Sequence, residues 1–154
     1  LVSHPDAEYH EGCTGVWQIP CDIALPSATQ NEIDEDSAKT LARNGCFAVA
    51  EGSNMSSTPQ AVEVFQSAGI LYAPGKAANA GGVATSALEM SQNSMRYFWS
   101  FEEVDCKLRN IMTNLYRNVS SAAAEYGMPG DFVTGANVAG FLKVADSMLA
   151  YGLV

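Results

Sequence analysis

The residues best suited to chemistry in this 154-residue chain gather in three short segments of small and polar side chains. The segments are "PSATQNE" (26–32), "EGSNMSS" (51–57) and "PGKAANAGG" (74–82). In the third segment a side-chain amide, Asn79, comes just before the glycine pair Gly81 and Gly82. Glycine lets the backbone approach a ligand closely, and an amide offers both a donor and an acceptor. These residue types favour binding a flat group with a polar rim.

Each segment follows a short apolar run that predicts a buried strand. The runs are "CDIALP" (21–26), "CFAVAE" (46–51) and "ILYAP" (70–74). Between them, Asp34 and Thr58 are expected to cap two helices, which Gly45 and Gly69 end. Strands that alternate with helices predict a parallel sheet, and such a sheet binds ligands at the carboxyl ends of its strands. The three segments are therefore expected to meet there, although each could also be an ordinary turn.

The second half of the chain predicts helices. One helix is expected over 82–98, and a capping box from Ser100 to Glu103 opens the next. The stretch "YGMPGD" (126–131) ends that helix, and apolar residues at helical spacing predict a last helix after it. The expected fold class is α/β, with half of a doubly wound parallel sheet followed by a helical tail.

Charge and composition argue against several classes of function. The net charge is -9 and the eight Lys and Arg residues form no stripe, which argues against a nucleic-acid partner. No apolar run is long enough to span a membrane and no leader-like segment is seen, so a cytoplasmic protein is expected. Four cysteines are present: Cys13, Cys21, Cys46 and Cys106. They form no C-x-x-C pair, and neither histidine stands at a metal-like spacing from them, so reduced thiols and no metal are expected.

Familiar catalytic motifs are missing. The sequence has no G-x-S-x-G, H-E-x-x-H or G-x-G-x-x-G, and "GKA" at 75–77 lacks the spacing of a phosphate-binding loop. Acidic loop residues such as Glu32 and Glu51 are expected to act as caps or hydrogen-bond acceptors. Because the chain opens with Leu1 rather than methionine, we expect a partial sequence whose catalytic machinery lies elsewhere. Alone, it is expected to be inactive and to associate through an unpaired strand edge.

Four stretches, in the same order, resemble one enzyme family. They are "DIALPSATQNE", "AVAEGSNM", "APGKAANAGGVATSALEMSQN" and "GANVAGFLKVADSMLA". Through them the chain resembles the carboxy-terminal third of hexameric glutamate dehydrogenase, NADP-type branch, in the Glu/Leu/Phe/Val dehydrogenase family. The resemblance implies the carboxy-terminal half of a Rossmann-like dinucleotide-binding domain over residues 1–81. It also implies a helical region over 82–154 that packs back toward an absent substrate domain.

The resemblance also implies a reaction and a set of contacts. The reaction is the reversible oxidative deamination of L-glutamate to 2-oxoglutarate and ammonia, with hydride transfer to NADP, or to NAD, in a homohexamer. The family's catalytic lysine and aspartate lie in motifs that this chain lacks, so no catalytic residue is assigned. Five residues are implied as cofactor contacts: Ala28, Thr29, Gln30, Asn54 at the ribose and Asn79 at the nicotinamide carboxamide. Val83 and Ser86, three positions apart on one helix face, are implied to face the substrate.

Alternatives remain open. Ser86 could hydrogen-bond back to its own helix, and Asn79 could serve only the backbone of its loop. Leucine, valine and phenylalanine dehydrogenases look apolar where Ser86 stands, so this hydroxyl favours glutamate over their substrates. The missing phosphate-binding and catalytic motifs leave a non-catalytic dinucleotide-binding module as a second alternative.

Overall fold

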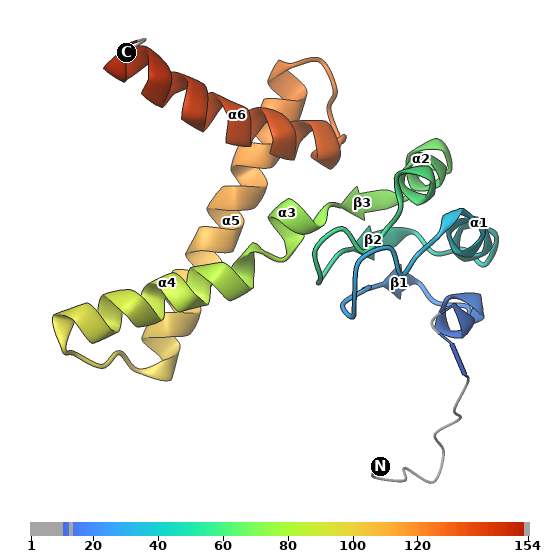
Figure 1. Cartoon of the computed structure of the whole chain (residues 1–154), viewed down its shortest axis with the longest axis horizontal. Coiled ribbons are helices and arrows are strands. Elements are labelled where there is room, and N and C mark those ends of the chain that lie inside the picture. The colour runs from blue at the N-terminus through green and yellow to red at the C-terminus, as the bar shows by residue number, and fades with distance from the viewer. Residues whose placement is uncertain (1–10, 13, 153–154) are drawn as a thin grey trace, which may run out of the picture.

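The computed structural model of the chain describes residues 11–12 and 14–152. Its first half alternates strands and helices: η1 (Gly15–Gln18), β1 (Ile23–Ala24), α1 (Glu35–Arg43), β2 (Ala48–Ala50), α2 (Pro59–Ser67) and β3 (Leu71–Ala73). Its second half is helical: α3 (Gly75–Ala78), α4 (Ala80–Met95), α5 (Phe101–Glu125) and α6 (Phe132–Tyr151). In Figure 1, α1 and α2 lie to the right of the strands, and α3 leads from the tip of β3 to α4 and α5 on the left. The predicted α/β class, a parallel sheet followed by a helical tail, is confirmed.

The strands form one parallel sheet in the order β1-β2-β3. In its register Ala24, Val49 and Tyr72 lie side by side, and all three are buried. Each strand lies inside one of the predicted apolar runs but is only two or three residues long. Because the strands are parallel, the loops that follow β1, β2 and β3 leave the sheet at the same edge, as predicted.

Local sequence signals determine where α1 and α2 begin and end. The side chains of Asp34 and Thr58 accept hydrogen bonds from backbone N–H groups three residues further on, at 2.8 and 3.2 Å. Past the other ends, Gly45 and Gly69 adopt left-handed φ angles of 87° and 71°. Other side chains would be strained at these angles. Both predicted helices are confirmed, with the predicted caps.

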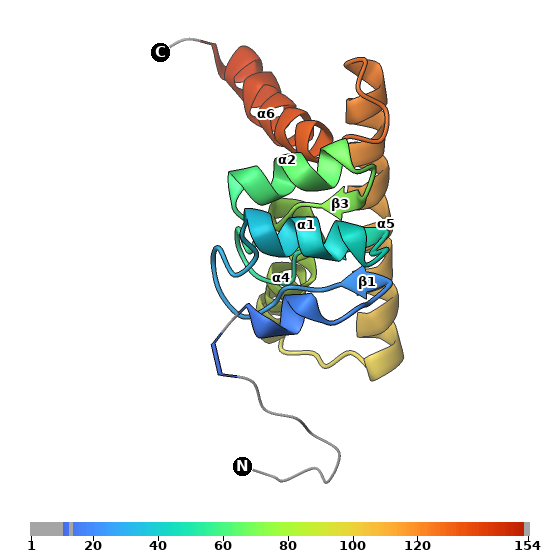
Figure 2. The same ribbon diagram turned by 90° about the vertical axis from the view of Figure 1, so that its right-hand side faces the viewer.

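Helices α1 and α2 cover one face of the sheet (Figure 2). Their fully buried side chains pack on the buried strand residues: Ala38, Leu41, Ala61 and Phe65. The Phe65 and Tyr72 rings lie 5.6 Å apart between centroids. On the opposite face, Ile23 and Leu71 share one row of the register and are 51% and 58% exposed. The described residues therefore cover the sheet fully on one face only.

The junction after β3 differs from the prediction. The segment expected as a loop over 74–82 contains one helical turn, α3, and α4 begins at Ala80 rather than at 82. The two helices follow each other directly, since Asn79 both ends α3 and begins α4. The small residues on either side of Asn79 leave room for this tight junction. The helix α4 also ends at Met95 rather than at 98, since Arg96 adopts a left-handed φ of 54°.

The helical half is built around α5, which packs against α4 and α6 (Figure 1). The predicted capping box opens α5: Ser100 Oγ accepts from Glu103 N, and the Glu103 carboxylate accepts from Ser100 N. The helix α6 crosses α5 at Gly135, where an added β-carbon would overlap the carbonyl oxygen of Val119. At the start of α6, the Asp131 side chain accepts from two backbone N–H groups.

Two further observations bear on the expectations from composition. Within the described part of the chain, no helix combines the length and the apolarity needed to cross a membrane. Three cysteines are free thiols: Cys21, Cys46 and Cys106. Cys13 and both histidines, on which the metal expectation partly rests, lie outside the described residues.

Candidate functional site

The loops that follow β1 and β2 are joined by hydrogen bonds. Asn31 N donates to Met55 O at 2.9 Å, and Ser53 Oγ donates to Thr29 O at 3.3 Å. Asn31 and Met55 both have left-handed φ angles, of 55° and 49°, so each loop turns sharply where the two meet. These contacts hold the first loop, with its exposed predicted site residues, against the second.

The second loop and the segment after β3 meet through two predicted site residues. Asn79 Nδ2 donates to Asn54 Oδ1 at 2.7 Å. Each amide keeps its other group for a further partner, so Asn79 retains an acceptor and Asn54 a donor. The two residues are 25 positions apart, and the parallel sheet brings them together. The result is a donor and an acceptor side by side at the carboxyl edge of the sheet.

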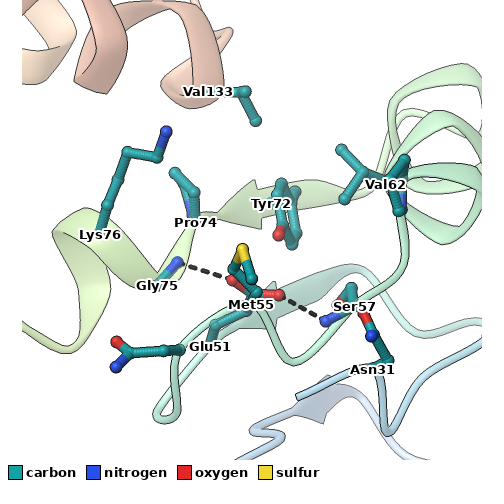
Figure 3. Close-up of a pocket in the computed structure, with 12 residues that line it drawn as sticks. Asn31, Glu51, Met55, Ser57, Val62, Tyr72, Pro74, Gly75, Lys76 and Val133 are labelled. Carbon is teal, nitrogen blue, oxygen red and sulfur yellow. Dashed lines mark hydrogen bonds between the residues drawn. The ribbon is translucent and has the colours of Figure 1, made fainter.

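The buried carboxylate of Glu51, 3% exposed, lies next to this pair. Its Oε1 accepts from Ser57 N and its Oε2 from Gly75 N, both at 2.7 Å (Figure 3). Burial, and then the neighbouring Glu51 carboxylate, raise the pKa of the Tyr72 phenol above its ordinary value. Tyr72 therefore keeps its proton at neutral pH. The expectation that Glu51 is a hydrogen-bond acceptor is confirmed.

A second buried glutamate, Glu32, organises the first loop. It is 7% exposed, and its Oε1 accepts from Ala28 N at 3.2 Å. Its backbone carbonyl accepts from Trp17 Nε1 at 3.0 Å, which anchors the loop to η1. The acceptor role expected for Glu32 is confirmed, and the bonds of its carboxylate stay within its own loop.

A cavity of about 780 Å³ opens beside Asn54 (Figure 3). Apolar side chains from four parts of the chain line it: Met55, Val62, Tyr72 and Val133. Lys76 also lines the cavity, and its ammonium group donates to Asn137 Oδ1 of α6. The sequence did not predict this cavity, because its walls come from a loop, two helices and a strand that are distant along the chain.

The first turns of α4 carry the remaining predicted residues. Val83 is 72% exposed, and a β-carbon added at Gly82 would meet nothing within 4 Å. Thr85 and Ser91 each donate to the helix carbonyl four residues before them. Ser86 has no such bond in the part of the chain that the structure describes, so the back-bonding alternative for this hydroxyl is not observed.

The structure therefore joins only some of the predicted site residues. Asn54 and Asn79 touch, and Thr29 is tied to the second loop through its carbonyl. Among the described residues, no hydrogen bond links Gln30, Val83 or Ser86 to that pair. No group of three or more metal-ligating side chains gathers among these residues either. The site offers hydrogen-bonding groups beside open space.

A family model described as Glutamate/Leucine/Phenylalanine/Valine dehydrogenase matches residues 2–152. The chain belongs to this family. The glutamate dehydrogenase of Bacteroides thetaiotaomicron is 58% identical over 151 residues, which cover 96% of this chain and 33% of that enzyme. The NADP-specific glutamate dehydrogenase of Escherichia coli K12 is 56% identical over 141 residues, 90% of this chain and 31% of that enzyme. The chain thus spans about a third of the length of these dehydrogenases.

Solved structures of the dehydrogenase family share this fold. Plasmodium falciparum glutamate dehydrogenase matches with a TM-score of 0.86 and 51% identity, over 90% of this chain and 30% of its own. The hetero-hexameric glutamate dehydrogenase of Thermus thermophilus, in its Leu-bound form, matches with a TM-score of 0.84. Its 22% identity supports likeness of fold alone. The resemblance seen in the four sequence stretches is confirmed, and the chain has the fold of the matching part of Plasmodium falciparum glutamate dehydrogenase.

Proposed function

We propose that this chain supplies one part of the dinucleotide site of a glutamate dehydrogenase. The protein that contains it would catalyse reversible oxidative deamination of L-glutamate to 2-oxoglutarate and ammonia, with hydride transfer to NADP. The contact of 2.7 Å between Asn79 and Asn54 carries this proposal, because it leaves one donor and one acceptor free at the carboxyl edge of the sheet. The free acceptor of Asn79 can meet the amide N–H₂ of a nicotinamide carboxamide, and the free donor of Asn54 can meet a ribose hydroxyl.

The cofactor is proposed to be NADP, with NAD as the alternative. Several relatives are named NADP-specific, and one from Xylanibacter ruminicola is named NAD(P)-specific. When bound, the cofactor supplies the hydride acceptor. The chain's own part is to orient that group: Ala28, Thr29 and Gln30 line it from the first loop, Asn54 approaches the ribose, and Asn79 holds the carboxamide. Open space at Gly82 fits the close approach of a flat ring.

The proposed substrate contacts are Val83 and Ser86. Val83 offers an apolar surface, and Ser86 lies on the same helix face. Within the described residues, the Ser86 hydroxyl does not donate to its helix as those of Thr85 and Ser91 do. The beginning of a helix also favours an anion. These features suit an aliphatic chain that ends in a carboxylate, as in glutamate, better than the apolar side chains of leucine, valine or phenylalanine.

The proposal also covers the domain organisation and the oligomeric state of the whole protein. Residues 1–81 would complete a dinucleotide-binding domain, and residues 82–154 would pack back toward a substrate domain. The catalytic groups would lie in that other domain. We further propose a cytoplasmic homohexamer. The exposed Ile23 and Leu71 on the second face of the sheet are compatible with cover from other parts of the protein.

The test begins with the reading frame that encodes this chain. Its whole product is expected to contain a G-x-G-x-x-G segment and a glycine-flanked lysine upstream, and to oxidise L-glutamate with NADP. A matched assay with L-leucine distinguishes the substrates, and a preference for leucine would replace the substrate assignment. A product that binds NADP but turns over none of the family's amino acids would favour the binding-module alternative.

A further inference from the structure

Glu51 is a buried side chain beside the candidate site that accepts hydrogen bonds from two separate backbone segments. Its two oxygens each accept a backbone N–H at 2.7 Å, one from Ser57 in its own loop and one from Gly75 at the start of α3. Figure 3 shows the carboxylate between these two donors. It therefore bridges the segment that carries Asn54 and the segment that carries Asn79.

A charge in this position requires full compensation, because an unpaired buried carboxylate is strongly unfavourable. Neither ion pair among the described residues involves Glu51. The nearest lysine along the chain after it, Lys76, donates to Asn137 instead. The compensation comes from backbone N–H groups, and such charge-assisted bonds are short and directional. The carboxylate thus fixes where the two backbone segments lie relative to each other.

The packing at Gly75 is tight enough for this fixed position to matter. A β-carbon there would lie 2.7 Å from Ser53 O and 3.1 Å from Glu51 Oε2, and also 3.5 Å from Asn79 Nδ2. Only glycine lets α3 approach the second loop this closely. The backbone of Gly75 therefore lies between the Glu51 carboxylate and the Asn79 amide.

We propose that Glu51 is a positioning residue for the cofactor ring. It holds α3 against the second loop so that the Asn79 amide lies against Asn54 with its free acceptor outward. This inference rests on the proposed function, since it assigns Glu51 a role through Asn79 at that same site. Among the described residues, the carboxylate of its buried counterpart Glu32 bonds only within the first loop and has no such role.

The experiment uses the whole product of the reading frame and the variant Glu51→Gln. This change keeps the shape but puts an amide N–H₂ against one backbone N–H, so one of the two bonds is lost. The dissociation constant for NADPH is expected to rise about tenfold or more. In the ligand-free variant, backbone amides of residues 75–80 are expected to exchange with deuterium faster than in the wild type.

A double-mutant cycle separates positioning from a general loss of stability. If Glu51 acts through Asn79, Glu51→Gln costs little further NADPH affinity in an Asn79→Ala background. The matched control is Glu32→Gln, the same substitution at a buried glutamate, whose effect should add to that of Asn79→Ala. Should Glu51→Gln fail to fold, Gly75→Ala disturbs the same contact from the opposite side and takes its place in the cycle.

Two failures are distinguishable. If the wild-type product does not bind NADPH, the proposed function fails. If the wild type binds and Asn79→Ala weakens binding, the proposed function stands. Full additivity of Glu51→Gln with Asn79→Ala, together with unchanged exchange at 75–80, would then overturn the positioning role alone.

Discussion

Gly82 illustrates how much a single missing side chain can matter. It stands in the first turn of α4, and a β-carbon there would meet nothing within 4 Å of this chain. Gly82→Ala should therefore leave the fold intact and slightly favour the helix. If the nicotinamide ring lies against this turn, the added methyl group intrudes on it. The affinity for NADPH is expected to fall about tenfold.

Isothermal titration of NADPH into the whole product measures this effect, with thermal unfolding as the companion measurement. Gly140→Ala is the matched control, since it adds the same methyl group to α6 in equally open space. An unchanged NADPH affinity in Gly82→Ala would place the ring elsewhere.

At the residue scale, sequence reasoning singled out Asn54 and Asn79 but did not predict the hydrogen bond between them. Asn54 and Asn79 stand out because each lies in a polar loop after a strand. The acceptor role of Glu51 was expected as well. Its bridge to Gly75 was not, because the donor is a backbone N–H 24 positions away, and a backbone N–H carries no sequence signal.

At the scale of elements, the crossing of α5 and α6 depends on one glycine. A β-carbon at Gly135 would overlap Val119 O and lie 3.0 Å from the Ala123 β-carbon. Gly135→Ala is therefore expected to push α6 off α5 and to lower the free energy of unfolding by about 1–3 kcal/mol. Chemical denaturation of the whole product measures the change.

The control substitution for Gly135→Ala lies in the same helix, α6. Gly140→Ala meets no neighbour, so it should raise the free energy of unfolding by up to about 1 kcal/mol through helix propensity. Equal effects of the two substitutions would mean that α6 does not cross α5 at Gly135.

The start of α6 carries a pH-dependent contribution. Burial raises the pKa of Asp131, but hydrogen bonds from Thr134, Val133 and Gln66 lower it by more, so the pKa lies below its ordinary value. A lowered folded pKa stabilises the protein above the ordinary carboxyl pKa, and the stabilisation is lost as the pH falls through the lowered value. Asp131→Ala should cost about 1 kcal/mol at neutral pH.

Unfolding measured across pH tests this cap. The deficit of Asp131→Ala relative to the wild type should shrink as the pH falls below about 4, the ordinary Asp range. Asp131→Asn keeps an acceptor oxygen for the helix and should lose less at neutral pH. A deficit that is constant with pH would show that the carboxylate charge has no part in the cap.

Most element types, and several ends, could be predicted because their signals are local. Asp34, Thr58 and the capping box at Ser100 each act within three residues, and all three are confirmed. The exceptions are α3 and both ends of α4. The residue with left-handed φ that ends α4 is Arg96 rather than glycine, so the sequence does not predict this helix end. The helical turn at 75–78 lies where proline and glycine predict a loop.

At the scale of the whole molecule, the sequence indicated a buried parallel sheet. It did not indicate that one face of this sheet would be left partly exposed. Ile23 and Leu71 are more than half exposed, and so is Leu25 after β1. The helix α6 adds exposed Phe141 and Leu149. Apolar periodicity shows which positions of a strand are apolar, but not which of its two faces the rest of the chain covers. Parallel sheets are normally covered on both faces.

The chain expressed alone is therefore expected to associate. Large exposed apolar patches favour contact between copies, while a net charge of -9 opposes it through mutual repulsion. Added salt screens the repulsion and leaves the apolar attraction, so association should increase with ionic strength.

Sedimentation velocity of the isolated chain at low and high salt measures both effects. Leu71→Lys on the uncovered face should reduce association, while Lys39→Gln on the exposed side of α1 should not. A chain that stays monomeric at high salt would contradict the prediction, because the repulsion that could hide apolar attraction is then screened.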